Sequence, residues 1–217
     1  MLTVHHLGKS QSERIVWLCE ELGIPYDLKL YQRQPNFQAP AEYKALHPMG
    51  LAPVITDNSV TGDDLVLAES GAVVDYILGR YGKGALRPGP EDAAFADYLY
   101  WFHFANGSFQ PAVMRVLIAR RLEAPAEHPA VQIGITRLGM MLAMLDTRLR
   151  DVPWLAGAAF TAADIMPVFT LTTMRHFLPY DLSPYPNILG WLQRVAARPA
   201  YQRAMQKGDP GMELLLG

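Results

Sequence analysis

The sequence predicts an α/β domain with a mixed sheet, followed by an all-helical domain. Strand-like and helix-like segments alternate from the N-terminus to about Tyr81. From Ala93 onward, nearly every segment repeats its apolar residues at helical spacing. The stretch between them, residues 82–92, is rich in Gly and Pro, which is typical of a linker. We therefore expect one domain at residues 1–82 and a second at residues 90–217.

The first domain is expected to run strand, helix, strand, irregular segment, strand, strand, helix. Short alternating or continuous apolar runs predict the strands, at residues 3–7, 26–31, 52–56 and 65–68. The first helix, residues 12–23, has one apolar stripe formed by Ile15, Leu18, Cys19 and Leu22. The second helix, residues 69–82, has another, formed by Val73, Val74, Ile77, Leu78 and Tyr81. Turn residues at 56–64 predict a connection between the last two strands.

The second domain carries further helical stripes and one capping signal. The stripes are Leu138, Leu142, Leu145 and Leu149, and then Ile188, Leu189, Leu192 and Val195. Thr161 followed by Asp164 is a variant of the capping box, so a helix should begin there. Pro167 lies inside that helix and should kink it.

Composition excludes several classes of protein. Half of the 217 residues are hydrophobic and the formal net charge is −2, without a run of Lys or Arg, which argues against a general nucleic-acid binder. The single cysteine, Cys19, fits a reducing compartment. The N-terminus lacks the features of a signal peptide, and no apolar run is long enough to span a bilayer. We therefore expect a soluble cytoplasmic protein without a membrane segment.

Four stretches carry a resemblance to a known family: "HHLGKSQSERIVWLCEELGIPYDL", "HPMGLAPVI", "AESGAVVDYI" and "TAADIM". Their order and spacing resemble the cytosolic glutathione transferases, most closely the bacterial and fungal serine-type members. The resemblance covers nearly the whole chain. It implies a thioredoxin-like N-terminal domain that binds glutathione, an all-helical C-terminal domain, a homodimer, and neither metal nor flavin.

The resemblance assigns glutathione to two places in the first domain. Pro53 matches a family proline that follows a cis peptide bond, where Ala52 presents its backbone N–H and C=O to the cysteinyl part of glutathione. Glu69 and Ser70 lie where the second helix begins, and a helix N-terminus favours a carboxylate. There Ser70 suits the carboxylate, and Glu69 suits the ammonium, of the γ-glutamyl end.

A serine before the first helix is expected to activate the thiol. In serine-type members a hydroxyl at the position of Ser10 hydrogen-bonds the glutathione sulfur, and a donor near a helix N-terminus favours thiolate over thiol. Ser12 competes for this role and is also the candidate N-cap; the motif spacing favours Ser10. Arg14 either supplies charge near the site or is a solvated side chain of the first helical turn.

Leu51 departs from the family pattern. Close relatives often have Lys or Gln at this glutathione-binding position, where it reaches the glycyl carboxylate. His47 and Gln38 are the candidate substitutes, although the sequence does not locate them. This departure puts the affinity for glutathione in question.

The electrophile pocket is expected in the helical domain, along residues 100–114. His103, Gly107 and Met114 share a helical face there, and Gly107 leaves room beside it. An aromatic and methionine stripe of this kind also fits a packed core or a dimer interface. These three residues are therefore our candidates for the pocket wall, with His103 as its polar group.

Other chemistries receive less support from the sequence. Cys19 lies well inside the first helix on its apolar stripe, so we expect a buried, inert thiol rather than a thiol–disulfide centre. His5 and His6 are adjacent on a strand and should point to opposite faces. Neither a C-x-x-C pair nor an H-E-x-x-H motif is present, so no metal is expected.

These observations predict an enzyme that adds the glutathione thiolate to small hydrophobic electrophiles. Peroxide reduction with glutathione is a further expected activity, and detoxification is the expected role. A non-catalytic ligand-binding or interaction protein is the alternative, since the fold alone does not determine function. Leu51 is the residue that keeps this alternative open.

Overall fold

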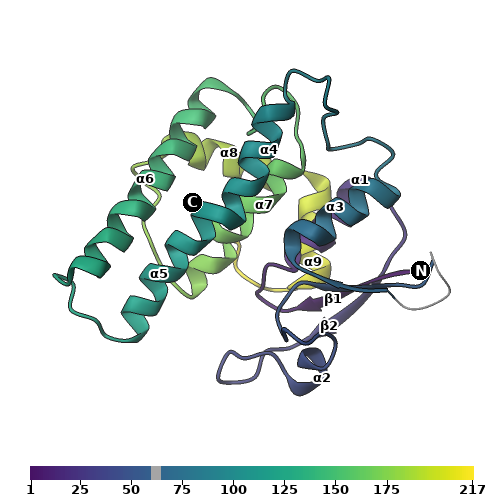
Figure 1. The fold of residues 1–217 in the computed structure, drawn as a ribbon, viewed down its shortest axis with the longest axis horizontal. Helices are drawn as coiled ribbons and strands as arrows, with labels where there is room; N and C mark the ends of the chain where they lie inside the picture. Colours follow the sequence, from purple (N-terminus) through teal and green to yellow (C-terminus); the bar gives the residue numbers. More distant parts are fainter. Residues whose placement is uncertain (60–64) are drawn as a thin grey trace. The chain divides into compact units, whose positions relative to one another are not determined.

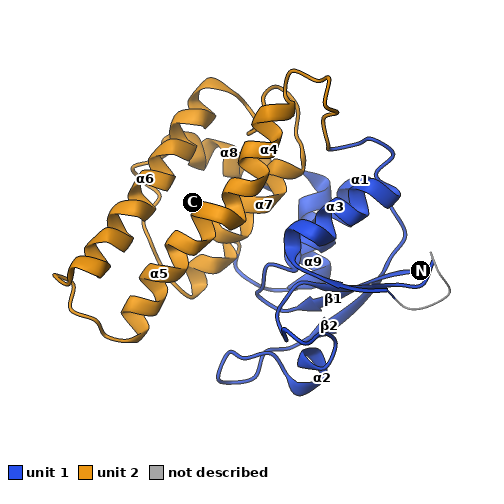
Figure 2. Cartoon of the chain, in the orientation of Figure 1, with its two compact units in different colours: residues 1–86, 196–213 blue, residues 87–195, 214–217 orange. Residues whose placement is uncertain are grey.

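The computed structural model describes residues 1–59 and 65–217, and its contacts divide the chain into two compact units (Figure 2). The first unit comprises Met1–Leu86 and Ala196–Glu213, and the second comprises Arg87–Val195 and Leu214–Gly217. The division after Leu86 falls inside the expected linker. Residues 196–213, which the sequence pattern alone assigns to the helical domain, belong to the first unit instead.

Within the described residues, the first unit contains a four-stranded sheet in the order β2-β1-β3-β4. Figure 1 shows β1 and β2 next to each other in this sheet. The strands are β1 Leu2–Leu7, β2 Asp27–Tyr31, β3 Val54–Asp57 and β4 Leu65–Ala68. β1 is parallel to β2 and antiparallel to β3, and β3 is antiparallel to β4, which confirms the mixed sheet. Of the turn predicted at residues 56–64, positions 60–64 lie outside the described residues.

Helix α1 (Glu13–Leu22) packs against α3 (Ser70–Tyr81) and α9 (Pro199–Gly208). Most of the predicted α1 stripe is buried, and so is the rest of the helix from Glu13 to Glu20. Trp17 meets Tyr201 of α9 edge to face, with 5.0 Å between ring centroids. These contacts explain why residues 196–213 pack with the first unit. The short helix α2 (Ala41–Lys44) follows β2.

The second unit is helical, as predicted. Its elements are α4 Phe95–Phe104, the π-helix η1 Ala105–Phe109, α5 Gln110–Arg121, α6 Pro129–Asp151, α7 Ala162–Leu171, the 3₁₀ helix η2 Thr173–His176 and α8 Pro186–Ala196. All four leucines of the predicted α6 stripe are buried. In α8, Trp191 is buried and Leu189 only half-buried, so the stripe is centred one position away from the prediction. Within residues 1–59 and 65–217, none of the helices combines the length and apolarity needed to cross a membrane.

Candidate functional site

The loop between β1 and α1 carries both candidate serines, and both are buried. Ser10 Oγ lies 2.7 Å from Ser12 Oγ and accepts the backbone N–H of Ser12 at 3.2 Å. Ser12 occupies the N-cap position of α1, but its side chain does not cap the helix. Its Oγ instead accepts the N–H of Leu7 at 3.1 Å and lies 3.0 Å from His6 Nδ1. The hydroxyl of Ser12 is therefore engaged with the end of β1.

Arg14 is completely buried, so the interpretation as a solvated side chain is wrong. Its Nη1 donates to Gln11 Oε1 at 2.7 Å and to Ser70 Oγ at 3.1 Å. Burial lowers the pKa of Arg14 to about 10, and the nearby Glu13 opposes this shift. The guanidinium stays charged at neutral pH, and it joins the start of α1 to the start of α3.

A small cavity of about 50 Å³ brings together four of the predicted glutathione-binding residues. Its lining consists of Gln11, Met49, Leu51, Ala52, Ala68, Glu69 and Ser70. The peptide bond between Ala52 and Pro53 is cis, as the resemblance implied, and Pro53 is buried before β3. Segments far apart in the sequence therefore meet at one site.

Glu69 has an unusual backbone conformation at this cavity. Its φ is 70°, in the left-handed region that non-glycine residues rarely adopt. Glu69 is the residue before α3, and Ser70 is the first residue of the helix. Such strain persists where the surrounding structure holds it, and it clusters at ligand sites.

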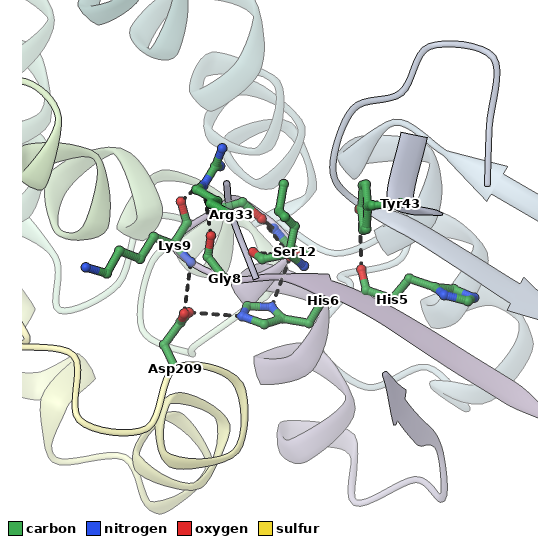
Figure 3. A network of polar contacts seen from close by, with 10 residues as sticks. His5, His6, Gly8, Lys9, Ser12, Arg33, Tyr43 and Asp209 are labelled. Atoms are coloured by element: carbon green, nitrogen blue, oxygen red, sulfur yellow. Dashed lines mark hydrogen bonds and ion pairs between the residues drawn. The ribbon is translucent and has the colours of Figure 1, made fainter. Parts of the chain in front are cut away.

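A larger cavity of about 570 Å³ also borders the β1–α1 loop, and the sequence analysis did not predict it. Its lining comes from that loop, from the segment after β2 and from the end of α9. Asp209 accepts the backbone N–H of Lys9 at 2.8 Å and lies 3.0 Å from His6 Nε2 (Figure 3). Arg33 donates to the carbonyl of Gly8 at 2.9 Å. No sequence motif indicated this cavity, because its walls are more than 170 residues apart along the chain.

A cation that sequence reasoning missed lies beside Gly50, the residue that precedes the exposed Leu51. Lys44 of α2 packs against Gly50, where an added Cβ would lie 3.4 Å from Lys44 Cγ. Its Nζ donates to Gln38 Oε1 at 2.8 Å. Gln38, one of the two residues expected to substitute for a basic residue at Leu51, is thus hydrogen-bonded to Lys44. His47 accepts the N–H of Met49 at 3.3 Å through Nδ1.

The remaining predicted residues lie in the second unit or in the core. His103 and Gly107 are exposed on α4 and η1, and Met114 is partly buried on α5. The π-helix between them alters the spacing on which their shared face was predicted. Cys19 is buried as expected, and burial raises the pKa of its thiol. The described residues contain no group of three or more His, Cys, Asp or Glu side chains placed to hold a metal ion.

Comparisons with known proteins identify the family to which this chain belongs. The model of the glutathione S-transferase N-terminal domain matches residues 10–78, and that of the C-terminal domain matches residues 92–199. Glutathione S-transferase 3 of Schizosaccharomyces pombe is 31% identical over 95% of this chain and 88% of its own length. The chain belongs to the glutathione S-transferase family. It is a glutathione transferase with the two-domain fold of that family, thioredoxin-like and helical.

Other relatives of this transferase extend the comparison. A glutathione S-transferase structure from Actinobacillus pleuropneumoniae has a TM-score of 0.86 and 32% identity, covering 98% of this chain and 95% of the other. A glutathione transferase from Burkholderia graminis, solved with two glutathione molecules bound per subunit, has a TM-score of 0.76 and 25% identity, covering 97% and 89%. The Escherichia coli protein named disulfide-bond oxidoreductase YfcG is 27% identical over 98% of both chains.

Proposed function

We propose that this transferase is a serine-type enzyme that binds glutathione at the small cavity and ionises its thiol with Ser10. The observation that carries the proposal is the meeting of Ala52, Glu69 and Ser70 at one cavity. Ala52 contributes the backbone before a cis proline, Glu69 a strained acidic residue, and Ser70 the N-terminus of α3.

The γ-glutamyl end of glutathione fits the residues at the start of α3. Its carboxylate would accept hydrogen bonds from the Ser70 hydroxyl and from the first N–H groups of the helix. Arg14 supports this assignment, because its buried guanidinium donates to Ser70 Oγ and so places a positive charge beside the start of α3. The carboxylate of Glu69 would bind the ammonium group.

The cysteinyl part would pair with the backbone of Ala52, which directs the sulfur toward the β1–α1 loop. Ser10 is the better candidate for the sulfur, because the hydroxyl of Ser12 is already engaged by Leu7 and His6. A hydroxyl near the start of α1 favours the thiolate through its hydrogen bond and through the helix dipole.

The glycyl carboxylate would bind Lys44, in place of the basic residue that is absent at Leu51. We expect Lys44→Met to raise the Kd of glutathione about three- to tenfold, as for loss of one partly exposed ion pair. The effect should appear in KM and leave kcat nearly unchanged, because Lys44 is remote from the sulfur. Titrations of both proteins with glutathione would measure it.

Two controls isolate the glycyl carboxylate. Glutathione monoethyl ester lacks that charge, so Lys44→Met should not weaken its binding. Lys29→Met removes an exposed lysine from β2 and should leave the Kd of glutathione unchanged. Equal weakening of glutathione and its ester would contradict the role of Lys44.

The second substrate is a small hydrophobic electrophile, for which haloaromatic conjugation and peroxide reduction are the first assays. Lowering a thiol pKa by about two units raises its thiolate fraction at neutral pH some twenty-fold. The accompanying loss of nucleophilicity, about eight-fold, leaves a net gain of only about three-fold. Positioning the electrophile must therefore supply most of the rate. His103, Gly107 and Met114 remain the proposed wall, and the cavity beside Lys9 is a second candidate because Lys9 adjoins Ser10.

We further propose that the protein is a homodimer, as the family resemblance implies, and that it acts in the cytoplasm in detoxification. A thiol–disulfide activity through Cys19 is not proposed, because that thiol is buried within α1. We therefore do not extend the disulfide-bond oxidoreductase activity in the name of the Escherichia coli relative to Cys19.

The experiment that tests the site is a glutathione titration followed by ultraviolet difference absorbance near neutral pH. A saturable thiolate signal is expected. S-methylglutathione, which has no thiol, should bind without that signal and thereby report on the rest of the site. If neither compound binds at millimolar concentration, the proposed site is wrong.

A further inference from the structure

A chain of hydrogen bonds connects Ser10 to a buried histidine–aspartate pair. Ser10 Oγ is 2.7 Å from Ser12 Oγ, Ser12 Oγ is 3.0 Å from His6 Nδ1, and His6 Nε2 is 3.0 Å from Asp209 Oδ2. Figure 3 shows His6 between Ser12 and Asp209. The side chains of His6 and Asp209 are only 1% and 7% exposed.

We propose that His6, held by Asp209, accepts the proton that leaves the glutathione thiol, through Ser12 and Ser10. This inference rests on the proposed function of Ser10. It adds a destination for the proton, which a serine alone does not provide, because a serine hydroxyl can only pass a proton on.

Asp209 determines which nitrogen of neutral His6 carries the hydrogen. Burial raises the pKa of Asp209, but the hydrogen bonds from His6 and the Lys9 backbone, together with the charge interactions with His6 and Lys9, outweigh it and hold the pKa below its ordinary value. An ionised carboxylate only accepts hydrogen bonds, so His6 must donate from Nε2. Nδ1 then carries a lone pair directed at Ser12, as in other histidines oriented by an aspartate.

The positions of the two serine hydroxyl hydrogens follow from the same count of donors and acceptors. Ser12 Oγ donates to His6 Nδ1 at 3.0 Å rather than to the carbonyl of Leu7 at 3.4 Å. With its hydrogen used, Ser12 Oγ accepts from the N–H of Leu7 and from the hydroxyl of Ser10. Ser10 Oγ accepts the N–H of Ser12 and retains one lone pair. Before ionisation Ser10 therefore presents an acceptor, which suits a thiol S–H.

Ionisation of the thiol reverses the direction of each hydrogen bond in the chain. The S–H bond breaks and its proton bonds to Ser10 Oγ, the Ser10 proton passes to Ser12 Oγ, and the Ser12 proton bonds to His6 Nδ1. The products are a thiolate and an imidazolium, and both serines remain neutral. Ser10 now carries the hydrogen that came from the thiol and donates it in a hydrogen bond to the thiolate.

The groups around His6 are an acidic side chain and the end of a helix. Asp209 is the ionisable group in contact with it, and the C-terminal end of α9, where the helix dipole is negative, abuts the ring. A Cβ added at Gly208 would lie 3.1 Å from His6 Nε2, so glycine permits this close approach. The other charged residues at this end of the cavity are Lys9 and Arg33, both near Asp209.

A proton count on the unaltered enzyme tests the relay. Thiolate absorbance and proton release, followed with an indicator dye in weak buffer near neutral pH, are measured in the same glutathione titration. Protons exchanged on binding S-methylglutathione are subtracted. We expect the thiolate to form with well below one proton released per thiolate, because His6 keeps it. Release of about one proton per thiolate would overturn the relay and leave the Ser10 site standing, whereas binding without thiolate would overturn both.

Asp209→Asn provides the matched variant. The Lys9 N–H requires the amide oxygen, so the amide NH₂ faces His6 and forces the imidazole hydrogen onto Nδ1. His6 then cannot accept from Ser12, and proton release should rise to about one per thiolate, with a several-fold lower thiolate fraction at neutral pH. Asp27→Asn, on exposed β2, should match the unaltered enzyme.

His6→Gln should behave like Asp209→Asn in both readouts, and thermal unfolding identifies any variant that is not folded. If the folded variants lose stability but keep the proton count and the thiolate fraction, the pair serves only to fasten the C-terminal segment, and the relay is wrong.

Discussion

Replacing Ser10 with Ala is expected to lower the thiolate fraction of bound glutathione about twenty-fold near neutral pH, as its thiol pKa returns toward about 8.5. Turnover should fall less, by roughly three- to tenfold, because the thiolate that does form is more nucleophilic. Ultraviolet difference titration and kcat/KM, measured over a range of pH, would give both numbers. Ser183→Ala, an exposed serine, is the control and should leave both unchanged.

The pH profile distinguishes thiol activation from positioning. If Ser10 acts by stabilising the thiolate, the deficit of Ser10→Ala must shrink as the pH rises. Above the ordinary thiol pKa, the variant should equal or exceed the unaltered enzyme, since both then hold a thiolate and that of the variant is less stabilised. A loss of several hundred-fold that persists at every pH would instead mean that Ser10 positions the sulfur or stabilises the transition state.

Local patterns predicted most of the elements because their physical causes are local. The α6 leucines recur at helical spacing, and the Thr161 and Asp164 pair forms the full capping box that its spacing indicated. Strands β1 to β4 fall where short apolar runs are bounded by turn residues. Motif spacing also selected residues of the small cavity, since Ala52 and Ser70 each lie where an element begins or ends.

Contacts between distant segments could not be predicted in this way. Asp209 lies 203 residues from His6 and looks, in the sequence, like an ordinary residue after a helix. Lys44, which we propose in place of the expected cation at Leu51, reaches Gly50 through the fold of α2 rather than through a motif. The periodicity of α9 is amphipathic, but periodicity does not say which unit the apolar face covers, so its packing on α1 was missed.

Asp164→Ala is expected to cost about 3–5 kcal/mol of unfolding free energy near neutral pH, because it leaves buried donors without an acceptor. Asp164 is fully buried, and Oδ1 accepts the N–H of Leu155 at 2.8 Å and Nε1–H of Trp191 at 3.2 Å. Oδ2 accepts the N–H of Thr161 at 3.0 Å. Urea unfolding of the variant measures the cost. Asp181→Ala, an exposed aspartate bonded to Ser183, should change stability by no more than about 0.5 kcal/mol.

The pH dependence of that loss follows from the balance at the carboxyl group. Burial raises the pKa of Asp164 to about 6, and the hydrogen bonds from Leu155, Thr161 and Trp191 only partly oppose it. A folded pKa above the unfolded value of about 3.9 means that this group adds stability at low pH, which is lost as the pH rises through about 6. Asp164→Ala lacks that contribution, so its deficit should be larger at pH 4 than at pH 8. A deficit that grows with pH would mean that the hydrogen-bond donors outweigh burial and hold the Asp164 carboxylate ionised. The capping box of α7 would then contain a charged carboxylate throughout this pH range.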